Sequence, residues 1–267
     1  MLVSVIIPVY NSEKTISRSI ESVVVSLTSC TDDYEIICVD DGSSDNSLEL
    51  LKKIALENSK IIVIHQDNAG AASARNRGLE TAKGDFIAFN DSDDEWTEDH
   101  AEVLLSLFDE FSDISCISGM HEDEKWRLAA LKKEKNNFYR VVLKNQLYKN
   151  YFSPQSTMLR RIIVDCGIRF VDGARYAEEG CFFNHISAQF GCGFIDKKLS
   201  ASILHKGRFG DCGLSGNLLG MERGEISNLI DARRNLGVGF FTFAGALVYS
   251  ILKYFRRIVI AKLRRAK

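Results

Sequence analysis

Hydrophobic residues in the first part of the chain gather in short, nearly unbroken runs that alternate with longer segments of helical periodicity. The runs, rich in β-branched or aromatic residues, are 2–9, 34–39, 61–65 and 86–89. The helix-period segments between them are 15–27, 47–57 and 71–82. Continuous apolar runs of this length are typical of strands buried on both faces of a parallel sheet. The pattern therefore predicts repeated β-α-β units whose loops share one crevice at the carboxyl ends of the strands.

The second part of the chain continues this pattern less regularly. Residues 101–111 predict an amphipathic helix and 114–118 another strand, whereas 122–149 is basic and poorly periodic and predicts a helix-and-loop excursion. Between 153 and 205 we expect short strands and one helix at 180–190. Since no linker interrupts these signals, we predict one domain over 1–220 with halves 1–119 and 120–220, followed by a helical segment, 221–267.

The C-terminal segment combines an uncharged stretch with a basic end. Residues 237–252 carry no charge, and 253–267 carry Lys and Arg with no acidic residue. The apolar run is shorter than the roughly 20 residues that span a bilayer. On a helical wheel, Ala244, Leu247, Ile251, Phe255 and Ile258 share one face, with Lys253, Arg256, Arg257 and Arg264 opposite. Two interpretations stay open: an interfacial anchor on an anionic leaflet, or a helix packed on the protein with a solvated basic end.

Composition narrows the class of protein. The 267 residues are 45% hydrophobic and 26% charged, which excludes a disordered or low-complexity chain. With 34 Lys and Arg against 36 Asp and Glu, net charge gives no reason to expect nucleic acid as a partner. The seven Cys form no Cys-x-x-Cys motif, which favours a reducing compartment over a disulfide scaffold. The N-terminus lacks a basic region and a cleavage site, so we expect a cytoplasmic protein without a signal peptide.

Three carboxylates in four residues, at Asp91, Asp93 and Asp94, follow the fourth predicted strand. Their mutual repulsion favours a divalent cation, and Mg²⁺ or Mn²⁺ is commonly held by one or two carboxylates together with substrate phosphates. A polar turn that caps the next helix is the alternative. A calcium loop is disfavoured, because Trp96 occupies the position at which such a loop needs glycine.

A second acidic loop, which begins with Asp40 and Asp41, follows the second predicted strand. A carboxylate there can accept an N–H from a nucleotide base, although a plain turn before the next helix would also explain it. Together the two loops would bracket a base and a metal-bound diphosphate. Neither a Gly-x-Gly-x-x-Gly motif after the first strand nor a Walker loop is present, so dehydrogenase and P-loop functions lack support.

Five ordered elements of the sequence resemble the family 2 glycosyltransferases of GT-A fold. They are Val-Ser-Val-Ile-Ile-Pro-Val-Tyr-Asn at 3–11, Val-Asp-Asp-Gly-Ser-Ser-Asp at 39–45, Gly70 with Ala74-Arg75-Asn76 and Gly78-Leu79, Gly84-Asp85-Phe86, and Asp91-Ser92-Asp93-Asp94. The resemblance is strong over about residues 2–100 and looser to about 210. It implies an α/β fold with a Rossmann-like, mostly parallel central sheet flanked by helices.

The resemblance also implies roles for residues of the first half. Tyr10 would stack on uracil, Pro8 and Val9 would line the base pocket, and Asp41 would accept the uracil N3 proton. Asp40 would support that loop or the ribose, and Arg75 would hold the base or diphosphate side. Asp93 would ligate Mn²⁺ or Mg²⁺, with Asp91 on the ribose or on a metal-bound water.

In the second half, such enzymes usually carry Glu-Asp before a helix, and the second carboxylate is the general base. This chain has Glu178-Glu179 instead, so Glu179 is the expected base and Glu178 its alternative. Both could simply be first-turn acids that a helix dipole favours. His205, Lys206 and Arg208 would cover the leaving diphosphate, although His205 could equally be a partly buried structural histidine.

The implied function is transfer of a hexose or N-acetylhexosamine from a UDP-sugar to a saccharide hydroxyl, with inversion to a β-glycoside. With the basic tail, we expect a lipid-linked acceptor, such as an undecaprenyl-diphosphate saccharide, in bacterial O-antigen or capsule synthesis. We also expect peripheral contact with the cytoplasmic face of the inner membrane. The competing hypotheses are a nucleotidyltransferase and a non-catalytic nucleotide-sugar binding protein.

Overall fold

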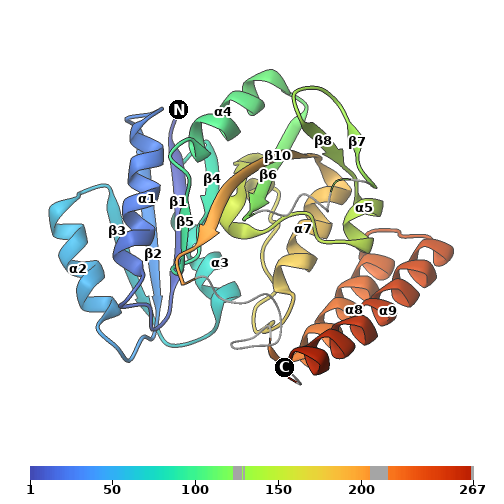
Figure 1. The fold of residues 1–267 in the computed structure, drawn as a ribbon. Helices are drawn as coiled ribbons and strands as arrows, with labels where there is room; N and C mark the ends of the chain where they lie inside the picture. The colour runs from blue at the N-terminus through green and yellow to red at the C-terminus, as the bar shows by residue number, and fades with distance from the viewer. Residues whose placement is uncertain (123–127, 129, 205–215, 266–267) are drawn as a thin grey trace.

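A mixed sheet, whose strands run mostly in one direction, organises the computed structural model, which describes residues 1–122, 128, 130–204 and 216–265 (Figure 1). The strand order is β3-β2-β1-β4-β9-β6-β10-β8-β7, and β5 pairs with β10. The first-half strands are β1 (Val3–Val9), β2 (Tyr34–Asp41), β3 (Ile61–Gln66), β4 (Phe86–Phe89), β5 (Asp94–Trp96) and β6 (Ile114–His121). The others are β7 (Lys132–Lys133), β8 (Phe138–Val141), β9 (Thr157–Arg160) and β10 (Gly191–Ser202). The parallel set β3-β2-β1-β4 confirms the predicted β-α-β repeats.

Helices cover both faces of this sheet. They are α1 (Ile16–Thr28), α2 (Ser47–Glu57), α3 (Ala71–Thr81), α4 (His100–Glu110), α5 (Leu143–Tyr148), α6 (Ile162–Asp165) and α7 (Glu178–Gln189), with a 3₁₀ turn at Pro154–Ser156. Because neighbouring side chains of a strand point to opposite faces, Val5 and Ile7 pack into a core with α1 and α4, and Ile6 packs with α3 and α7. Every residue of β1 is buried as a result.

The second half of the sheet differs from the sequence prediction in two places. The segment 122–149, expected to be helix and loop, contains strands β7 and β8 as well as α5. The region after 190 forms one strand of 12 residues, β10, in place of shorter ones. The sequence analysis missed the extent of β8 and β10 because the two strands pair with each other. Pairing between segments distant in sequence leaves little periodic signal in either segment.

Two antiparallel helices, α8 (Leu218–Asn235) and α9 (Phe240–Arg265), lie side by side at the lower right of the fold (Figure 1). A separate small core, which includes Leu229 of α8 and Ala246 of α9, joins them to α5. Within the described ranges, no helix has the length and apolar character needed to cross a membrane.

The packed face of α9 is not the one that the helical wheel suggested. Lys253 and Arg257, expected to face outward, bind Glu225 of α8 at 2.8 and 2.7 Å. Phe255, expected on the apolar face, is exposed. The interpretation as a packed helix with a solvated basic end was wrong on this point because Glu225 of α8, which the wheel of α9 alone does not contain, attracts the basic side chains inward.

Candidate functional site

The loops that follow β1, β2 and β4 meet at the carboxyl edge of the sheet. Asn11, in the loop after β1, accepts a hydrogen bond from the Ser44 amide through Oδ1 at 2.8 Å. Ser12, in the same loop, places its hydroxyl 2.7 Å from that of Ser92. One short loop thus binds both acidic loops. Because β2 and β4 flank β1, the acidic loops begin two strand spacings apart, roughly 10 Å.

Asp40 and Asp41 differ in how their buried carboxylates are used. Asp41 accepts hydrogen bonds from the backbone amides of Ala69 and Gly70, both at 2.8 Å, and from Gln66 Nε2 at 2.7 Å. It therefore shapes the loop that starts α3. Asp40 accepts a hydrogen bond from His65 Nδ1 at 2.8 Å through Oδ2, while its buried Oδ1 has no partner among the described residues. Buried carboxylate oxygens usually accept a hydrogen bond, so the bonding of Asp40 is incomplete among the described residues.

Backbone hydrogen bonds and the side chain of Asn90 hold the loop after β4 in place. The Asn90 amide group donates to the Ser19 hydroxyl and to the Asp94 carbonyl, both at 3.0 Å. Asp93 accepts a backbone hydrogen bond from Ile203 at 2.9 Å, directly after β10. Strand β5 then aligns Asp94 with Ser202 of β10. The C-terminal end of β10 therefore lies against the Asp91–Asp94 loop.

Arg75, on α3, joins the acidic loop to the Glu178-Glu179 pair. Its guanidinium binds Asp91 Oδ1 at 2.7 Å and Glu178 Oε1 at 3.2 Å, and the residue is only 5% exposed. Burial alone would lower the pKa of Arg75, but the two carboxylates raise it above its usual value, so the cation is permanent. A single buried charge thus brings together residues from α3, from the loop after β4 and from α7.

Glu179, the expected base, lies in the first turn of α7, partly buried next to Glu178. Burial, reinforced by the charge of Glu178, raises the pKa of Glu179 to about 7, although Arg75 and a backbone hydrogen bond oppose the rise. Ala177, directly before this pair, has a left-handed backbone with φ of 54°. Asn228 of α8 holds it by a 2.8 Å hydrogen bond to its carbonyl oxygen. Strained backbone held by a neighbouring element is common at functional sites.

The donor atoms around this loop fit a hard divalent cation. Asp91 uses one oxygen for Arg75, which leaves its other oxygen for a metal or a metal-bound water, and Asp93 is partly exposed at the same loop. Carboxylate oxygens of this kind suit Mg²⁺ or Mn²⁺, which complete their coordination with phosphate oxygens and water. The pair Asp91 and Asp93 would therefore hold such an ion.

A cavity of about 510 Å³ lies beside Glu178, between α7, α8 and the segment before α7. Its walls contain two arginines, one aromatic ring and two amides, at Arg175, Arg223, Tyr176, Asn217 and Asn228. Guanidinium groups bind phosphates, and aromatic rings and amides commonly contact sugars, so this lining is suited to a charged saccharide.

The structure brings most of the predicted site residues to one edge. Tyr10, 53% exposed, projects beside the Asp40-Asp41 loop at the end of β1, while Pro8 is buried within the strand. His205, Lys206 and Arg208 lie outside the described residues. Sequence reasoning missed His65, the partner of Asp40. The parallel register places these two residues opposite each other, so pairing the ends of the predicted strands would have found it.

The comparisons with known proteins decide the family. The model of glycosyl transferase family 2 matches residues 4–167, more than half of the chain. The chain belongs to glycosyl transferase family 2. This confirms the resemblance of the five sequence elements, and the fold agrees with it. TarS of S. aureus, solved with UDP-GlcNAc, superposes with a TM-score of 0.71 at 21% identity, covering 96% of this chain and 73% of that one. The mannosyltransferase PcManGT of Pyrobaculum calidifontis, solved with GDP-Man and Mn²⁺, gives 0.70 at 15%, covering 98% and 75%.

Two relatives of this family 2 member are named for specific glucosyltransferase reactions. WfgD of Escherichia coli, a UDP-Glc:α-D-GlcNAc-diphosphoundecaprenol β-1,3-glucosyltransferase, is 34% identical over 168 residues, 62% of this chain and 57% of WfgD. A poly(ribitol-phosphate) β-glucosyltransferase of Bacillus spizizenii is 44% identical over 96 residues, 35% of this chain and 15% of that protein. This chain spans about a third of the length of an uncharacterized Rickettsia felis glycosyltransferase that it matches at 32% identity over 74% of its own length.

Proposed function

We propose that this chain is an inverting, metal-dependent glycosyltransferase that moves a hexose or N-acetylhexosamine from a UDP-sugar to a hydroxyl of a saccharide acceptor. The observation that supports this most is that Arg75 forms ion pairs with both Asp91 of the acidic loop and Glu178, the neighbour of the expected base Glu179. The donor diphosphate and the acceptor hydroxyl must meet within a few ångströms for transfer. Because one guanidinium separates Asp91 from Glu178, the expected metal site and the expected base lie close enough together for that.

On the donor side, uracil would stack on the exposed ring of Tyr10, in a base pocket that Pro8 and Val9 would line. Asp41 would accept a hydrogen bond from the uracil N3–H beside its existing amide bonds, and Asp40 would support that loop or the ribose. Asp93 and Asp91 would hold Mn²⁺ or Mg²⁺ against the diphosphate. The ion, when bound, neutralises negative charge that develops on the leaving UDP.

On the acceptor side, Glu179 would take the proton from the attacking hydroxyl. A base whose pKa is near 7 is about half ionised at pH 7 and still has the basicity to accept that proton in the transition state. The hydroxyl oxygen attacks the anomeric carbon opposite to UDP, the bond to UDP breaks, and the configuration inverts. An α-linked donor therefore gives a β-glycoside.

The cavity beside Glu178 would hold the acceptor. Its arginines, Arg175 and Arg223, offer charges to a diphosphate, and Tyr176 offers a face to a sugar ring. A lipid-diphosphate-linked saccharide, such as an undecaprenyl-diphosphate intermediate of O-antigen or capsule synthesis, has both features. The acceptor that WfgD is named for and its similarity to this chain support that choice.

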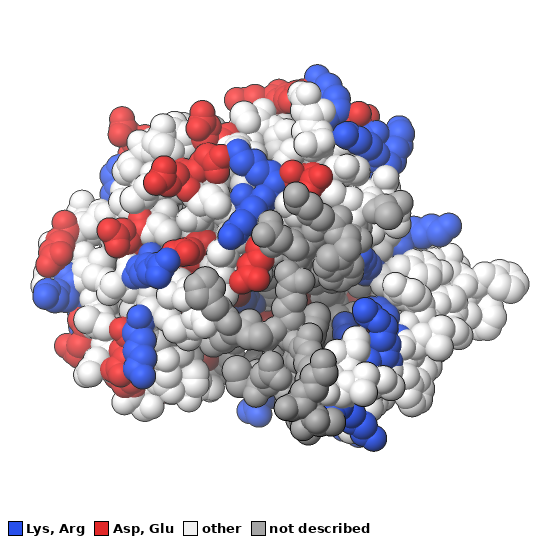
Figure 2. All heavy atoms as spheres, viewed as in Figure 1, with Lys and Arg blue, Asp and Glu red and all other residues white. Residues whose placement is uncertain are grey.

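We also propose that α9 contacts the membrane that carries such an acceptor, at the cytoplasmic face of the bacterial inner membrane. A stripe of exposed apolar side chains runs along the helix and comprises Phe241, Val248, Leu252, Phe255, Val259 and Leu263. Spacings of three, four and seven place them on one face, flanked by exposed Arg256 and Lys262. Figure 2 shows the projecting end of the α8–α9 hairpin largely free of charged side chains. An apolar stripe with basic borders is suited to an anionic leaflet.

Mass spectrometry of products tests the function. The full chain is incubated with Mn²⁺, a panel of UDP-sugars and a synthetic lipid-diphosphate saccharide. We expect one donor to be transferred with release of UDP. Glu179→Gln and Asp93→Ala should each abolish transfer, whereas the exposed controls Glu57→Gln and Asp109→Ala should not. A parallel incubation with UTP and a sugar 1-phosphate that yields a UDP-sugar and pyrophosphate would indicate a nucleotidyltransferase. UDP binding without turnover of any donor would indicate a binding protein, and activity retained in Glu179→Gln would refute the assigned base.

A further inference from the structure

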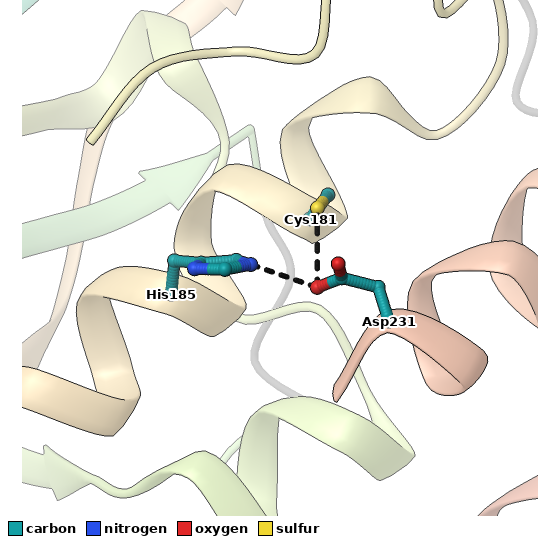
Figure 3. A group of neighbouring side chains, drawn as sticks. All are labelled: Cys181, His185 and Asp231. Carbon is teal, nitrogen blue, oxygen red and sulfur yellow. Dashed lines mark hydrogen bonds and ion pairs between the residues drawn. The ribbon is translucent and has the colours of Figure 1, made fainter. Parts of the chain in front are cut away.

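A cysteine, a histidine and an aspartate converge between α7 and α8 (Figure 3). Cys181 and His185 lie four residues apart on α7, so both point from one face of that helix. Asp231 points toward them from α8. Its Oδ2 accepts a hydrogen bond from His185 Nε2 at 2.7 Å and from Cys181 Sγ at 3.6 Å. One sulfur, one nitrogen and one oxygen donor thus lie within 4.8 Å of one another.

We propose that Cys181, His185 and Asp231 bind Zn²⁺. Thiolate, imidazole and carboxylate together are a donor set that zinc accepts in tetrahedral geometry, whereas Mg²⁺ and Mn²⁺ prefer oxygen donors alone. Ligands of one tetrahedral zinc ion are roughly 3.3–3.7 Å apart. The sulfur–oxygen distance of 3.6 Å already meets this value, and the nitrogen–oxygen distance of 2.7 Å needs only a small rotation of the Asp231 carboxylate.

The surroundings of the cluster provide what a zinc site requires. Asn235 donates a 2.6 Å hydrogen bond to Asp231 Oδ1, which fixes the carboxylate from the side that faces away from the cluster. His185 and Asp231 remain 30% and 26% exposed at their side chains, so an ion can enter. Cys181 and Asp231 also line the cavity beside Glu178, where water can take the fourth coordination position. The site is therefore a three-ligand centre that opens toward the cavity.

Zinc binding would release a proton from the thiol. Burial, with the charge of Asp231, raises the pKa of Cys181 to about 12, so the sulfur is protonated at neutral pH before the metal arrives. The affinity for Zn²⁺ should then rise with pH, because fewer protons compete with the metal for the Cys181 sulfur. Since the ion would link α8 to the helix that begins with Glu178 and Glu179, it should also stabilise the fold.

Cobalt spectroscopy on the full, metal-stripped chain tests the site. Co²⁺ titration should produce a thiolate-to-cobalt band in the near ultraviolet and visible bands of tetrahedral geometry, both removed by one equivalent of Zn²⁺. Competition with a chromophoric chelator should give a zinc Kd below about 1 μM, and zinc should raise Tm. These readouts need neither donor nor acceptor, so they are independent of transferase activity.

Matched variants complete the test. Cys181→Ser should remove the thiolate band, and Asp231→Asn should weaken zinc binding at least tenfold, whereas Cys166→Ser, at an exposed cysteine, should leave both unchanged. Circular dichroism confirms that each variant is folded. A cobalt spectrum without a thiolate band, or zinc binding that survives Cys181→Ser, would overturn the proposal and leave the trio as an interhelical hydrogen-bond cluster.

Discussion

The pH dependence of transfer is set by the pair Glu178 and Glu179. Raising the pKa of Glu179 from 4.5 to about 7 corresponds to about 3 kcal/mol of differential free energy between its protonated and ionised forms. If ionised Glu179 is the base, kcat should be near its plateau at pH 8 and about tenfold lower at pH 6. An ordinary glutamate would show no loss until well below pH 6.

Glu178→Gln isolates the electrostatic part of this shift. The substitution removes the neighbouring negative charge and frees Arg75 from one of its two carboxylates. Both changes favour ionised Glu179, so the acid limb of kcat should move to lower pH. It should not reach 4.5, because burial, the largest cause of the shift, remains.

The assay follows initial rates of UDP release from pH 5 to 9, with donor, acceptor and Mn²⁺ at saturating concentrations. Each variant is scaled to its own plateau, since loss of the Arg75 contact also lowers the rate itself. Glu57→Gln, at an exposed site on α2, is the control and should leave the midpoint unchanged. A wild-type profile flat to pH 5, or the same midpoint in Glu178→Gln, would refute this reasoning.

Four further results are expected. Glu179→Gln should raise Tm by a few degrees at pH 8 but not at pH 4.5. The reason is that a carboxyl group with a raised pKa in the folded state lowers the stability as pH rises from 4.5 through about 7. An equal gain in Tm at both pH values, measured by calorimetry, would contradict this. Arg75→Lys should lower kcat/KM at least tenfold, because one ammonium cannot reproduce the two-carboxylate contact, and wild-type kinetics would disprove that role. The double variant Leu252→Glu, Phe255→Glu should no longer sediment with anionic vesicles, whereas the control Glu98→Lys should still do so. Unchanged sedimentation of the double variant would argue against membrane contact. A concentration-dependent dimer of the wild type that the double variant loses would argue against it as well. Gly78→Ala should lower Tm by several degrees, since its methyl carbon would lie 2.3 Å from the Ile6 side chain; an undiminished Tm would show that α3 shifts freely.

The first half of the protein could be predicted from sequence because its signals are local. Buried parallel strands are continuous apolar runs, and the turns after them must carry polar residues, so β1 to β4 and the two acidic loops can be located without long-range information. Parallel crossovers then bring the carboxyl ends of the strands to one edge. The residues that mark the family lie in the same turns.

Only the tertiary structure decided which groups pair across the chain. Arg75 and Glu178 are 103 residues apart, and Cys181 and Asp231 are 50 residues apart, so no periodicity connects either pair. The face of α9 that packs inward depends on Glu225 of α8, which draws Lys253 and Arg257 toward it. Sequence patterns record whether a residue tends to be buried, because that depends on its own side chain. The identity of its partner depends on where distant elements pack, and that is fixed only when the chain folds.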